Sequence, residues 1–401
     1  IAQDYLAIYF GFIELTSLPF WLISLWVSFS TYYTDIFKKF ASIQVWKLSI
    51  IGGVGGAVGY YSGVHFAGID LLIPNKVIYF LWIFLSWAIF FPLSIKEYYG
   101  GSILNKILDL SIIFSFDKTG FFRHKKYFKN EEFCNLDNKT ILVTGGTSGI
   151  GREVTKNLSL AGSNLFFTGR NSSKGKMVES EKQKFFELDM ADWESINSFV
   201  SSIKPLDGII LNAGGMPDKY TVNEDGVELQ VASQLFGHYF LAKKLIQANK
   251  LTKGARIIWV SSGGMYLKKL DIDNLTGEGE NYDKVRTYAN VKRAQVTLVE
   301  ELAKDSVWND YEVVTMHPGW VGTDGVKDAL PKFYKFLGSR LRNVEPGADT
   351  IVWLIKTKEK LESGSFYFDR KVVSPYISKN FVPTNKQRTS ILSLLDKYWV
   401  P

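Results

Sequence analysis

Three side chains suited to moving a proton lie in two short segments of the chain. Tyr288 and Lys292 are four residues apart in a segment that predicts a helix, so they share one helix face. A free phenol titrates near pH 10, and a nearby ammonium favours the phenolate and lowers that pKa. Ser262 follows a predicted strand and can hydrogen-bond the oxygen that Tyr288 protonates; its neighbour Ser261 is the less favoured alternative. The pattern predicts acid–base chemistry at a carbonyl or an alcohol.

A glycine-rich turn stands where a dinucleotide could bind. Residues 140–143 predict a buried strand, 144–151 read Thr-Gly-Gly-Thr-Ser-Gly-Ile-Gly, and a helix is expected through about Ala161. Such a turn is tight, lets the backbone approach a pyrophosphate and points helix N–H groups at negative charge. The context of strand, turn and helix makes the motif specific. The expected cofactor contacts here are Gly145, Thr147, Ser148, Gly149, Ile150 and Gly151.

Residues after the next strands favour NADP(H) over NAD. The second strand, 164–168, ends in Gly169-Arg170 where an NAD-binding chain commonly has a carboxylate for the ribose hydroxyl. The guanidinium of Arg170 suits a phosphate instead. Asp189 ends a third strand and can accept from the adenine amino group. Further strands are expected at 209–211, 256–260 and 312–316, and the first of these leads into Asn212, Ala213 and Gly214, which we expect to contact the cofactor.

The ordered motifs Thr-Gly-Gly-x-x-x-Gly-Ile-Gly, Asn-Ala-Gly, Ser-Ser and Tyr-x-x-x-Lys resemble the short-chain dehydrogenase/reductase (SDR) superfamily over about residues 136–369. Finer features are similar to one branch, that of dehydrogenase/reductase SDR family member twelve; among them are Asp117-Lys118-Thr119-Gly120-Phe121 and His317-Pro318-Gly319-Trp320. The resemblance implies a Rossmann-type doubly wound parallel sheet of about seven strands. It also implies that Lys292 contacts the nicotinamide ribose and that residues 318–323 cover the nicotinamide, with Pro318, Gly319, Val321 and Thr323 as contacts.

One site position departs from the superfamily. The superfamily commonly has an asparagine in the helix before the serine strand, where it places a water that links the lysine to solvent. This chain has Gln234 there. Glutamine keeps the amide but moves it by one methylene, so we expect a proton relay that is slowed or lost.

The first hundred residues are rich in apolar side chains and predict a bundle of about three transmembrane helices. Stretches without formal charge run from Leu15 to Thr34, Leu48 to Ile69 and Val77 to Ile95, each near the 20 residues that a bilayer requires. We therefore expect a transmembrane region over 1–100. An interfacial amphipathic helix and a linker should follow over 101–135, and an NADP-binding domain over 136–401.

Charge and cysteine content limit the partners and the compartment. The net charge is +7, but the basic residues cluster beside apolar spans, which favours lipid headgroups over nucleic acid. Cys134 is the only cysteine, so a disulfide within the chain and a cysteine-based metal site are excluded, and no metal is expected. An odd number of spans and the Lys/Arg bias place the large domain in cytosol or matrix. We expect an integral protein of the mitochondrial inner membrane in preference to the endoplasmic reticulum.

Two functions of different classes follow. The first is a membrane-anchored NADP(H)-dependent oxidoreductase that interconverts a lipophilic carbonyl and alcohol. The second is an accessory subunit of a large, respiratory-type membrane complex whose SDR domain holds a nucleotide structurally. Gln234 and the overlapping Gly-x-x-x-Gly pairs of the second span, at Gly52, Gly55, Gly56, Gly59 and Gly63, favour the second function. Those glycines pack either against neighbouring spans of this chain or against other subunits.

Overall fold

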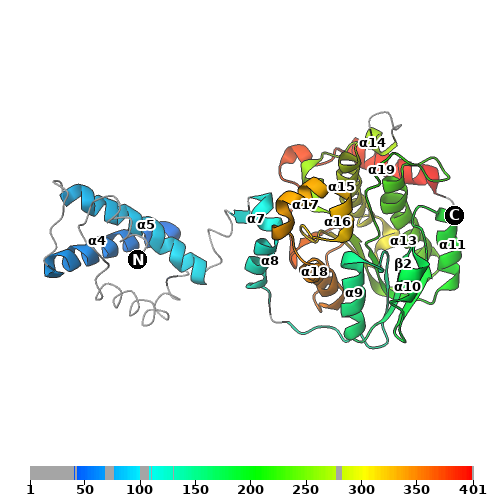
Figure 1. Cartoon of the computed structure of the whole chain (residues 1–401), viewed down its shortest axis with the longest axis horizontal. Coiled ribbons are helices and arrows are strands. Elements are labelled where there is room, and N and C mark those ends of the chain that lie inside the picture. Colours follow the sequence, from blue (N-terminus) through cyan, green and yellow to red (C-terminus); the bar gives the residue numbers. More distant parts are fainter. Residues whose placement is uncertain are drawn as a thin grey trace. The chain divides into compact units, whose positions relative to one another are not determined.

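The computed structural model describes residues 40, 43–67, 76–99, 108–109, 111–129, 131–276 and 282–399. The chain divides into two compact units, Ile1–Ile112 and Ile113–Pro401, which are treated separately below. The second unit, the catalytic unit, contains the sheet and all of the expected site residues (Figure 1).

A single eight-stranded sheet in the order β3-β2-β1-β4-β5-β6-β7-β8 organises the catalytic unit. Strands β1 to β7 pair in parallel. Their bounds are β1 Thr140–Val143, β2 Asn164–Gly169, β3 Gln183–Glu187, β4 Leu206–Leu211, β5 Leu251–Val260, β6 Glu312–Met316 and β7 Phe366–Phe368. The order changes direction between β1 and β4, and open α/β sheets bind ligands at the carboxyl ends of the strands at such a point.

The expectation of about seven strands was wrong by one. β8, Lys371–Val372, is a two-residue strand that pairs antiparallel with β7. The turn between them, Asp369-Arg370, has positive φ at both residues, which is the geometry of a two-residue hairpin. Neither residue is glycine, so the sequence lacked the usual signal for this turn.

Two apolar cores lie on opposite faces of the sheet, because successive strand residues point to opposite sides. Leu142, Ile209 and Ile257 belong to one core, and their neighbours Val143, Ile210 and Ile258 belong to the other. The first core receives α11 (Trp193–Ser202), α13 (His238–Gln247), α15 (Lys284–Leu302) and α19 (Asn385–Tyr398), and the second receives α9 (Gly149–Leu160) and α18 (Val344–Lys356). The sheet is therefore a covered, three-layer scaffold, as a parallel sheet requires.

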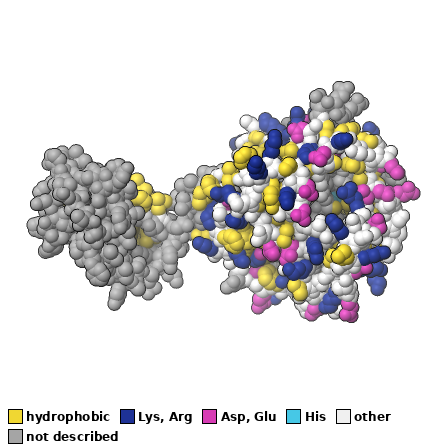
Figure 2. All heavy atoms as spheres, in the orientation of Figure 1, with side chains coloured by type: hydrophobic (Ala, Val, Ile, Leu, Met, Phe, Trp, Pro, Cys, Tyr) yellow, Lys and Arg dark blue, Asp and Glu magenta, His cyan; other side chains and the backbone are white. Residues whose placement is uncertain are grey.

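Shorter elements connect the strands and helices of this framework. They are α7 Ile112–Phe116, α8 Lys118–Lys125, α10 Ser172–Lys176, α12 Leu229–Val231, the π-helix η1 Ala232–Gly237, and the 3₁₀-helix η2 Gly263–Leu267. The others are α14 Ile272–Thr276, η4 Ser306–Trp308, α16 Asp324–Ala329, α17 Pro331–Leu337, η5 Gly338–Arg340 and η6 Lys379–Phe381. Apolar, basic and acidic side chains are interspersed on the visible face of the catalytic unit (Figure 2).

The first unit contains two described helices, α4 (Val45–Ala67) and α5 (Lys76–Tyr99), which pack against each other. Gly52 and Gly56 lie against α5: a Cβ at Gly52 would be 2.5 Å from Phe91 Cβ, and one at Gly56 would meet the Trp87 ring. Within the described residues, a Cβ at Gly55 or Gly59 would have no atom within 4 Å. Packing within the chain thus accounts for one of the Gly-x-x-x-Gly pairs.

The prediction of a bundle of three transmembrane helices was wrong for the described residues. The stretch 15–34 lies outside the described residues, and the other two stretches correspond to α4 and α5. Across the described part of the chain, no helix has both the length and the apolar content needed to cross a bilayer. The prediction counted the absence of charge, which differs from high apolarity: α4 is diluted by glycine, tyrosine and serine, and α5 contains Pro92 and two serines.

Candidate active site

Tyr288 and Lys292 lie one turn apart on α15, which begins after Asp283. The Asp283 carboxylate caps the helix by accepting from the N–H groups of Val285 and Arg286. The Lys292 Nζ atom lies 5.4 Å from the centroid of the Tyr288 ring. It donates to the carbonyl oxygen of Val260 at 3.0 Å, at the carboxyl end of β5. Helix and strand thereby hold the phenol and the amine together.

Burial shifts the pKa values of both groups. Lys292 is 3 % exposed, and desolvation lowers the pKa of its ammonium to about 7. Desolvation raises the pKa of Tyr288, and the hydrogen bond from Ser262 lowers it by a smaller amount. In the protein alone, the pKa of Tyr288 is therefore raised, whereas the sequence predicted that the neighbouring ammonium would lower it. No carboxylate among the described residues pairs with Lys292, so its charge state changes near neutral pH.

The two neighbouring serines have different surroundings. The Ser262 hydroxyl is hydrogen-bonded to Tyr288 and also accepts from the Gly264 N–H at 3.2 Å. The buried Ser261 hydroxyl instead donates to the Lys292 carbonyl oxygen at 3.0 Å. Ser262 faces the reacting group, and Ser261 ties β5 to α15.

The glycine turn has the shape that a dinucleotide requires. Gly145 and Gly149 have φ values of 67° and 53°. A Cβ at Gly145 would lie 2.9 Å from Ala213 Cα, so only glycine lets the turn approach the end of β4. Ser148 precedes α9 without a side-chain cap, which leaves the first N–H groups of that helix free of side-chain oxygen. These residues fit the pyrophosphate of a nicotinamide cofactor.

Thr144, for which the sequence predicted no role at the site, joins this turn to the end of β4. Its buried hydroxyl accepts from the N–H groups of Asn212 and Ala213 at 2.9 and 3.0 Å. The Asn212 amide in turn donates to the carbonyl oxygen of Thr144 at 3.1 Å. The Asn-Ala-Gly segment is thus held against the cofactor turn, and a threonine directly after a buried strand was the available signal.

Arg170 and Asp189 lie near each other at the ends of β2 and β3. Their closest nitrogen and oxygen atoms are 3.8 Å apart, and the Arg170 side chain is 75 % exposed. Thr147 lies beneath them, since a Cβ at Gly169 would be 2.8 Å from its Cγ2. The guanidinium is therefore available at the edge of the cofactor turn, where only a weak surface ion pair holds it.

Gln234 lies in the π-helix η1 and is fully buried. Its amide nitrogen donates to the Gly215 carbonyl oxygen at 2.9 Å, and its Oε1 has no hydrogen-bond partner in the described protein. The extra residue of a π-helical turn often occurs at a functional site. His238 is the first residue after this π-helix, and burial together with the charge of Lys292 lowers the pKa of its imidazole well below the usual value. Sequence reasoning missed His238 and the π-helix, because neither has a local pattern.

The loop after β6 closes over the glycine turn. A Cβ at Gly149 would be 3.2 Å from Thr323 Cγ2, and one at Gly347 would be 2.6 Å from Val321 Cγ2. Thr323 also caps α16 by accepting from the Val326 N–H at 3.3 Å. The segment that contains Pro318 and Gly319 therefore lies beside the turn, at the same edge of the sheet as Tyr288.

Comparison with known proteins places this geometry in a family. Residues 139–332 match a family model described as short chain dehydrogenase. The human protein Dehydrogenase/reductase SDR family member 12 is 34 % identical over 266 residues, which are 63 % of this chain and 83 % of that protein. The chain belongs to the short-chain dehydrogenase/reductase family. It is an NAD(P)-dependent oxidoreductase of this family.

Two further similar proteins have lower identity to this chain. Mouse retinol dehydrogenase 11 is 29 % identical and matches 58 % of this chain and 78 % of its own. An uncharacterized protein from Mycobacterium paratuberculosis shares the fold with a TM-score of 0.54 at 20 % identity, covering 66 % of this chain and 94 % of that one. Residues 1–93 match a second family model, described as a protein of unknown function (DUF2878).

The arrangement of Tyr288, Ser262 and Lys292 is suited to proton transfer at a carbonyl or alcohol oxygen. When bound, the nicotinamide supplies or accepts the hydride. Since the Tyr288 and Ser262 hydroxyls are hydrogen-bonded to each other, one substrate oxygen placed between them can accept from both. Tyr288 could then donate its proton during reduction, and Ser262 could stabilise the charge that develops on the oxygen. A protonated Lys292 could favour the resulting phenolate, since its Nζ atom lies 5.4 Å from the Tyr288 ring centroid.

Proposed function

We propose that the protein is an NADP(H)-dependent reductase that interconverts a lipophilic carbonyl compound and its alcohol. One observation carries this proposal: Tyr288, Ser262 and Lys292 lie together where the carboxyl end of β5 meets the amino-terminal half of α15. The glycine turn that fits a dinucleotide lies at the same edge of the sheet. All three side chains needed for the proton transfer are present: Tyr288 and Ser262 are hydrogen-bonded to each other, and Lys292 Nζ lies 5.4 Å from the Tyr288 ring centroid.

The choice of NADP(H) is supported by charge at the end of β2. Arg170 is exposed, and Lys174 and Lys176 follow it in α10. A 2′-phosphate at this place would replace the 3.8 Å contact with Asp189 by a bidentate one. No carboxylate stands at the Arg170 position to accept from a ribose hydroxyl, as NAD-binding turns commonly require.

An apolar substrate is supported by the side chains around the loop after β6. The Trp320 ring packs against the Phe333 ring of α17, with 5.3 Å between the ring centroids. Phe336 on the same helix is 82 % exposed. A patch of this kind binds apolar ligands better than polar ones. Retinol dehydrogenase 11, one of the relatives, is named for an apolar alcohol.

Label transfer tests this function directly. The purified full chain is incubated with NADPH tritiated at the nicotinamide C4 position and with an organic extract of cells, and the extract is then searched for a labelled alcohol. We expect label in an apolar alcohol with wild type and none with Tyr288→Phe. Label that stays in the nucleotide for every extract, while NADPH still binds, would reject the reductase.

A second candidate is an accessory subunit of a larger assembly, favoured by one observation in the first unit. The α4 positions Gly55 and Gly59 are open among the described residues, and the neighbouring Val54 and Val58 are 50 % and 59 % exposed. This face suits close packing by another apolar helix. Gly55→Leu together with Gly59→Leu should release the chain from such an assembly on native gels, whereas Gly52→Leu would disturb α5 instead.

A further inference from the structure

A short segment that precedes the matched SDR region is built into the catalytic crevice. The family match begins at residue 139, whereas Ser115 and Phe116 are the last two residues of α7 and Asp117 follows directly, before α8. All three are buried in the catalytic unit, at 6 %, 6 % and 0 % exposure. Gly263, Trp320 and Arg342, which contact this segment, are more than 140 residues away in the sequence, so the docking is tertiary structure rather than local folding.

The backbone of this segment holds the loop after β6. The Phe116 carbonyl oxygen accepts from the Trp320 N–H at 2.9 Å and from Arg342 Nε at 2.9 Å. Gly319 has a φ of 78°, and a Cβ there would lie 2.7 Å from the same oxygen. The loop that approaches Gly149 through Thr323 is therefore fixed at its start by residue 116.

The Phe116 ring supports the serine loop from the other side. A Cβ at Gly263 would be 2.6 Å from Phe116 Cε2, so the ring packs directly on the residue after Ser262. The same ring contacts His317 at 4.4 Å and Phe368 at 5.2 Å between centroids. One aromatic side chain thus touches the loops after β5 and β6 and the last residue of β7.

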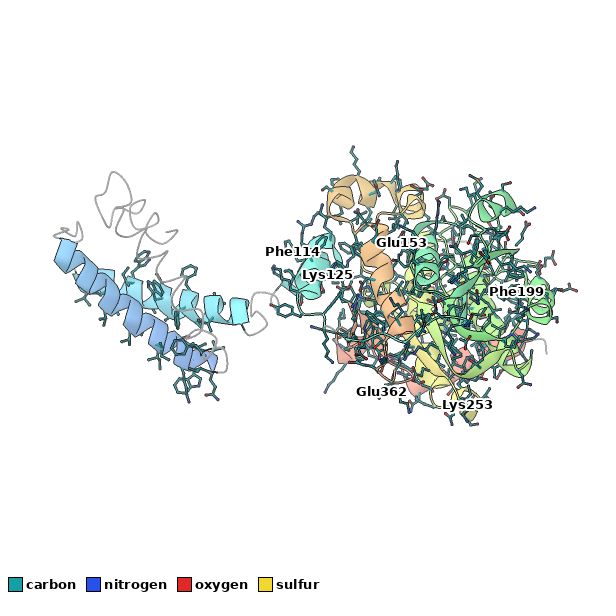
Figure 3. The ribbon with its side chains drawn as sticks, turned by 90° about the horizontal axis from the view of Figure 1, so that it is seen from below. Phe114, Lys125, Glu153, Phe199, Lys253 and Glu362 are labelled. Atoms are coloured by element: carbon teal, nitrogen blue, oxygen red, sulfur yellow. The ribbon has the colours of Figure 1, made fainter. Side chains whose placement is uncertain are left out.

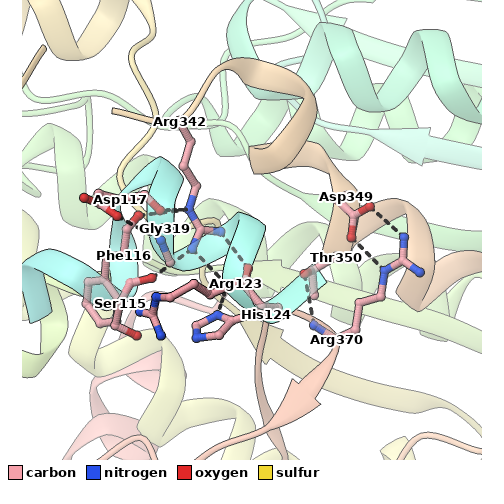
Figure 4. A network of polar contacts seen from close by, with 12 residues as sticks. Ser115, Phe116, Asp117, Arg123, His124, Gly319, Arg342, Asp349, Thr350 and Arg370 are labelled. Atoms are coloured by element: carbon pink, nitrogen blue, oxygen red, sulfur yellow. Dashed lines mark hydrogen bonds and ion pairs between the residues drawn. The ribbon is translucent and has the colours of Figure 1, made fainter. Parts of the chain in front are cut away.

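Arg342 joins these parts through a buried ion pair (Figure 4). Its guanidinium is fully buried and donates to both Asp369 oxygens, at 2.6 and 2.9 Å. It also donates to the carbonyl oxygens of Ser115 and Pro318, at 3.1 and 3.3 Å. Burying a charge requires such full pairing, so this network has a single well-defined geometry.

Two further contacts attach the segment at its ends. Asp117 caps α8 by accepting from the Gly120 N–H at 2.9 Å, and it pairs with Arg340. At the end of α8, the His124 ring is 2.6 Å from Asp369 Oδ2. The segment is therefore clamped at both ends of the helix and not only at Phe116.

We propose that residues 115–124 are a positioning element of the active site, in which Phe116 and Arg342 set the places of Ser262 and of the loop 317–323. Phe116 and Arg342 touch neither substrate nor cofactor in this role and act through Gly263 and Trp320. The proposal rests on the reductase function proposed above. It deepens that function by adding a segment outside the matched family region to the parts that the crevice needs.

A double-mutant cycle tests the ring. In the full chain, Phe116→Ala removes the support of Gly263, and Gly263→Ala forces a methyl group against the ring. With retinaldehyde as probe, we expect each single variant to lower kcat at least tenfold, because small displacements of Ser262 are costly. If the two losses were independent, the kcat of the double variant would fall by the product of the two single losses. We expect a kcat at least fivefold above that value, because the methyl group added by Gly263→Ala then fills the space vacated by the Phe116 ring. Independent losses, or a Phe116→Ala kcat within twofold of wild type, would overturn the proposal.

A matched arginine separates positioning from general stability. Arg256 donates to Glu312 at 2.9 Å and to the Leu354 and Thr357 carbonyl oxygens, at the opposite ends of the strands from Tyr288. Figure 3 shows Lys253, on the same strand, far from Phe114. Arg342→Lys and Arg256→Lys should both lower the melting temperature. Only Arg342→Lys should raise the NADPH Kd and lower kcat by tenfold; equal effects of the two variants would contradict the proposal.

Hydrogen exchange gives a readout that needs no turnover. The Trp320 and Gly322 amides donate to the Phe116 and Arg342 carbonyl oxygens, both at 2.9 Å. Phe116→Ala should speed exchange at these amides at least tenfold and leave the β1 amides unchanged. Absent turnover and absent NADPH binding in wild type would count against the reductase, whereas unchanged exchange would count against the positioning element alone.

Discussion

The Lys292 ammonium lies one helical turn from Tyr288, and yet its hydrogen bond is to the Val260 carbonyl oxygen at 3.0 Å. The tyrosine is bonded to Ser262 instead. Any influence of the amine on the phenol is therefore electrostatic, since its Nζ atom lies 5.4 Å from the ring centroid. Its influence depends on whether it is protonated, and burial has moved that equilibrium to about pH 7.

Removing Lys292 should stabilise the cofactor-free protein in a pH-dependent way. The folded pKa of about 7 lies below the ordinary 10.5, so the unfolded chain binds more protons between these values. The cost of the buried ammonium is then largest below pH 7 and vanishes near pH 10.5. Lys292→Met should exceed wild type in unfolding free energy by about 5 kcal/mol at pH 6 and by about 2 kcal/mol at pH 9. Urea unfolding at the two pH values measures this, and a difference independent of pH would contradict it.

Substitution of Ser262 should lower kcat, whereas substitution of Ser261 should lower stability. Ser262→Ala removes a donor to the reacting oxygen and should lower kcat about 100-fold with little change in stability. Ser261→Ala removes a buried hydrogen bond to Lys292 and should cost about 1 kcal/mol of stability. Steady-state kinetics and urea unfolding of both variants check this, and reversed roles would move the catalytic assignment to Ser261.

Charge reversal at Arg170 should change cofactor preference. Arg170→Glu places a carboxylate at the end of β2, which repels a 2′-phosphate and can accept from a ribose hydroxyl. The ratio of NADPH to NADH affinity should fall at least 100-fold in titrations of both nucleotides. Lys253→Glu, an equally exposed reversal on β5, should leave the ratio unchanged. A preference that survives Arg170→Glu would show that another group selects the cofactor.

The buried pair of Arg342 and Asp369 should be costly to break. Burial raises the pKa of Asp369, but Arg342 and His124 together lower it by more than burial raises it. The net pKa of Asp369 therefore lies below the ordinary value. Its stabilisation is thus present above pH 4 and is lost as pH falls further. Asp369→Asn leaves Arg342 unpaired and should cost about 3 kcal/mol at pH 7. Thermal or urea unfolding at pH 7 measures the loss, and a cost under about 1 kcal/mol would show that the pair is dispensable.

The catalytic fold was predictable where chemistry constrains neighbouring residues. The turn at 144–151 and the spacing of Tyr288 and Lys292 are local patterns, and each lies on the expected element. The clamp of Phe116 on Gly263 joins residues with no shared pattern, because long-range packing leaves no local signal. The π-helix at Gln234 and the hairpin at Asp369 likewise depend on tertiary context. Charge-free stretches such as 48–69 predicted helices but not their apolarity.

The central claim is that the Tyr288 hydroxyl transfers a proton at a crevice that binds NADPH. The most direct measurement follows NADPH oxidation at 340 nm with retinaldehyde, for wild type and Tyr288→Phe, after NADPH binding to both has been titrated. We predict turnover by wild type, a loss of at least 1,000-fold in Tyr288→Phe, and NADPH Kd values that agree within threefold. Equal turnover by the two proteins, or tight NADPH binding without turnover by either on any carbonyl tested, would contradict the account.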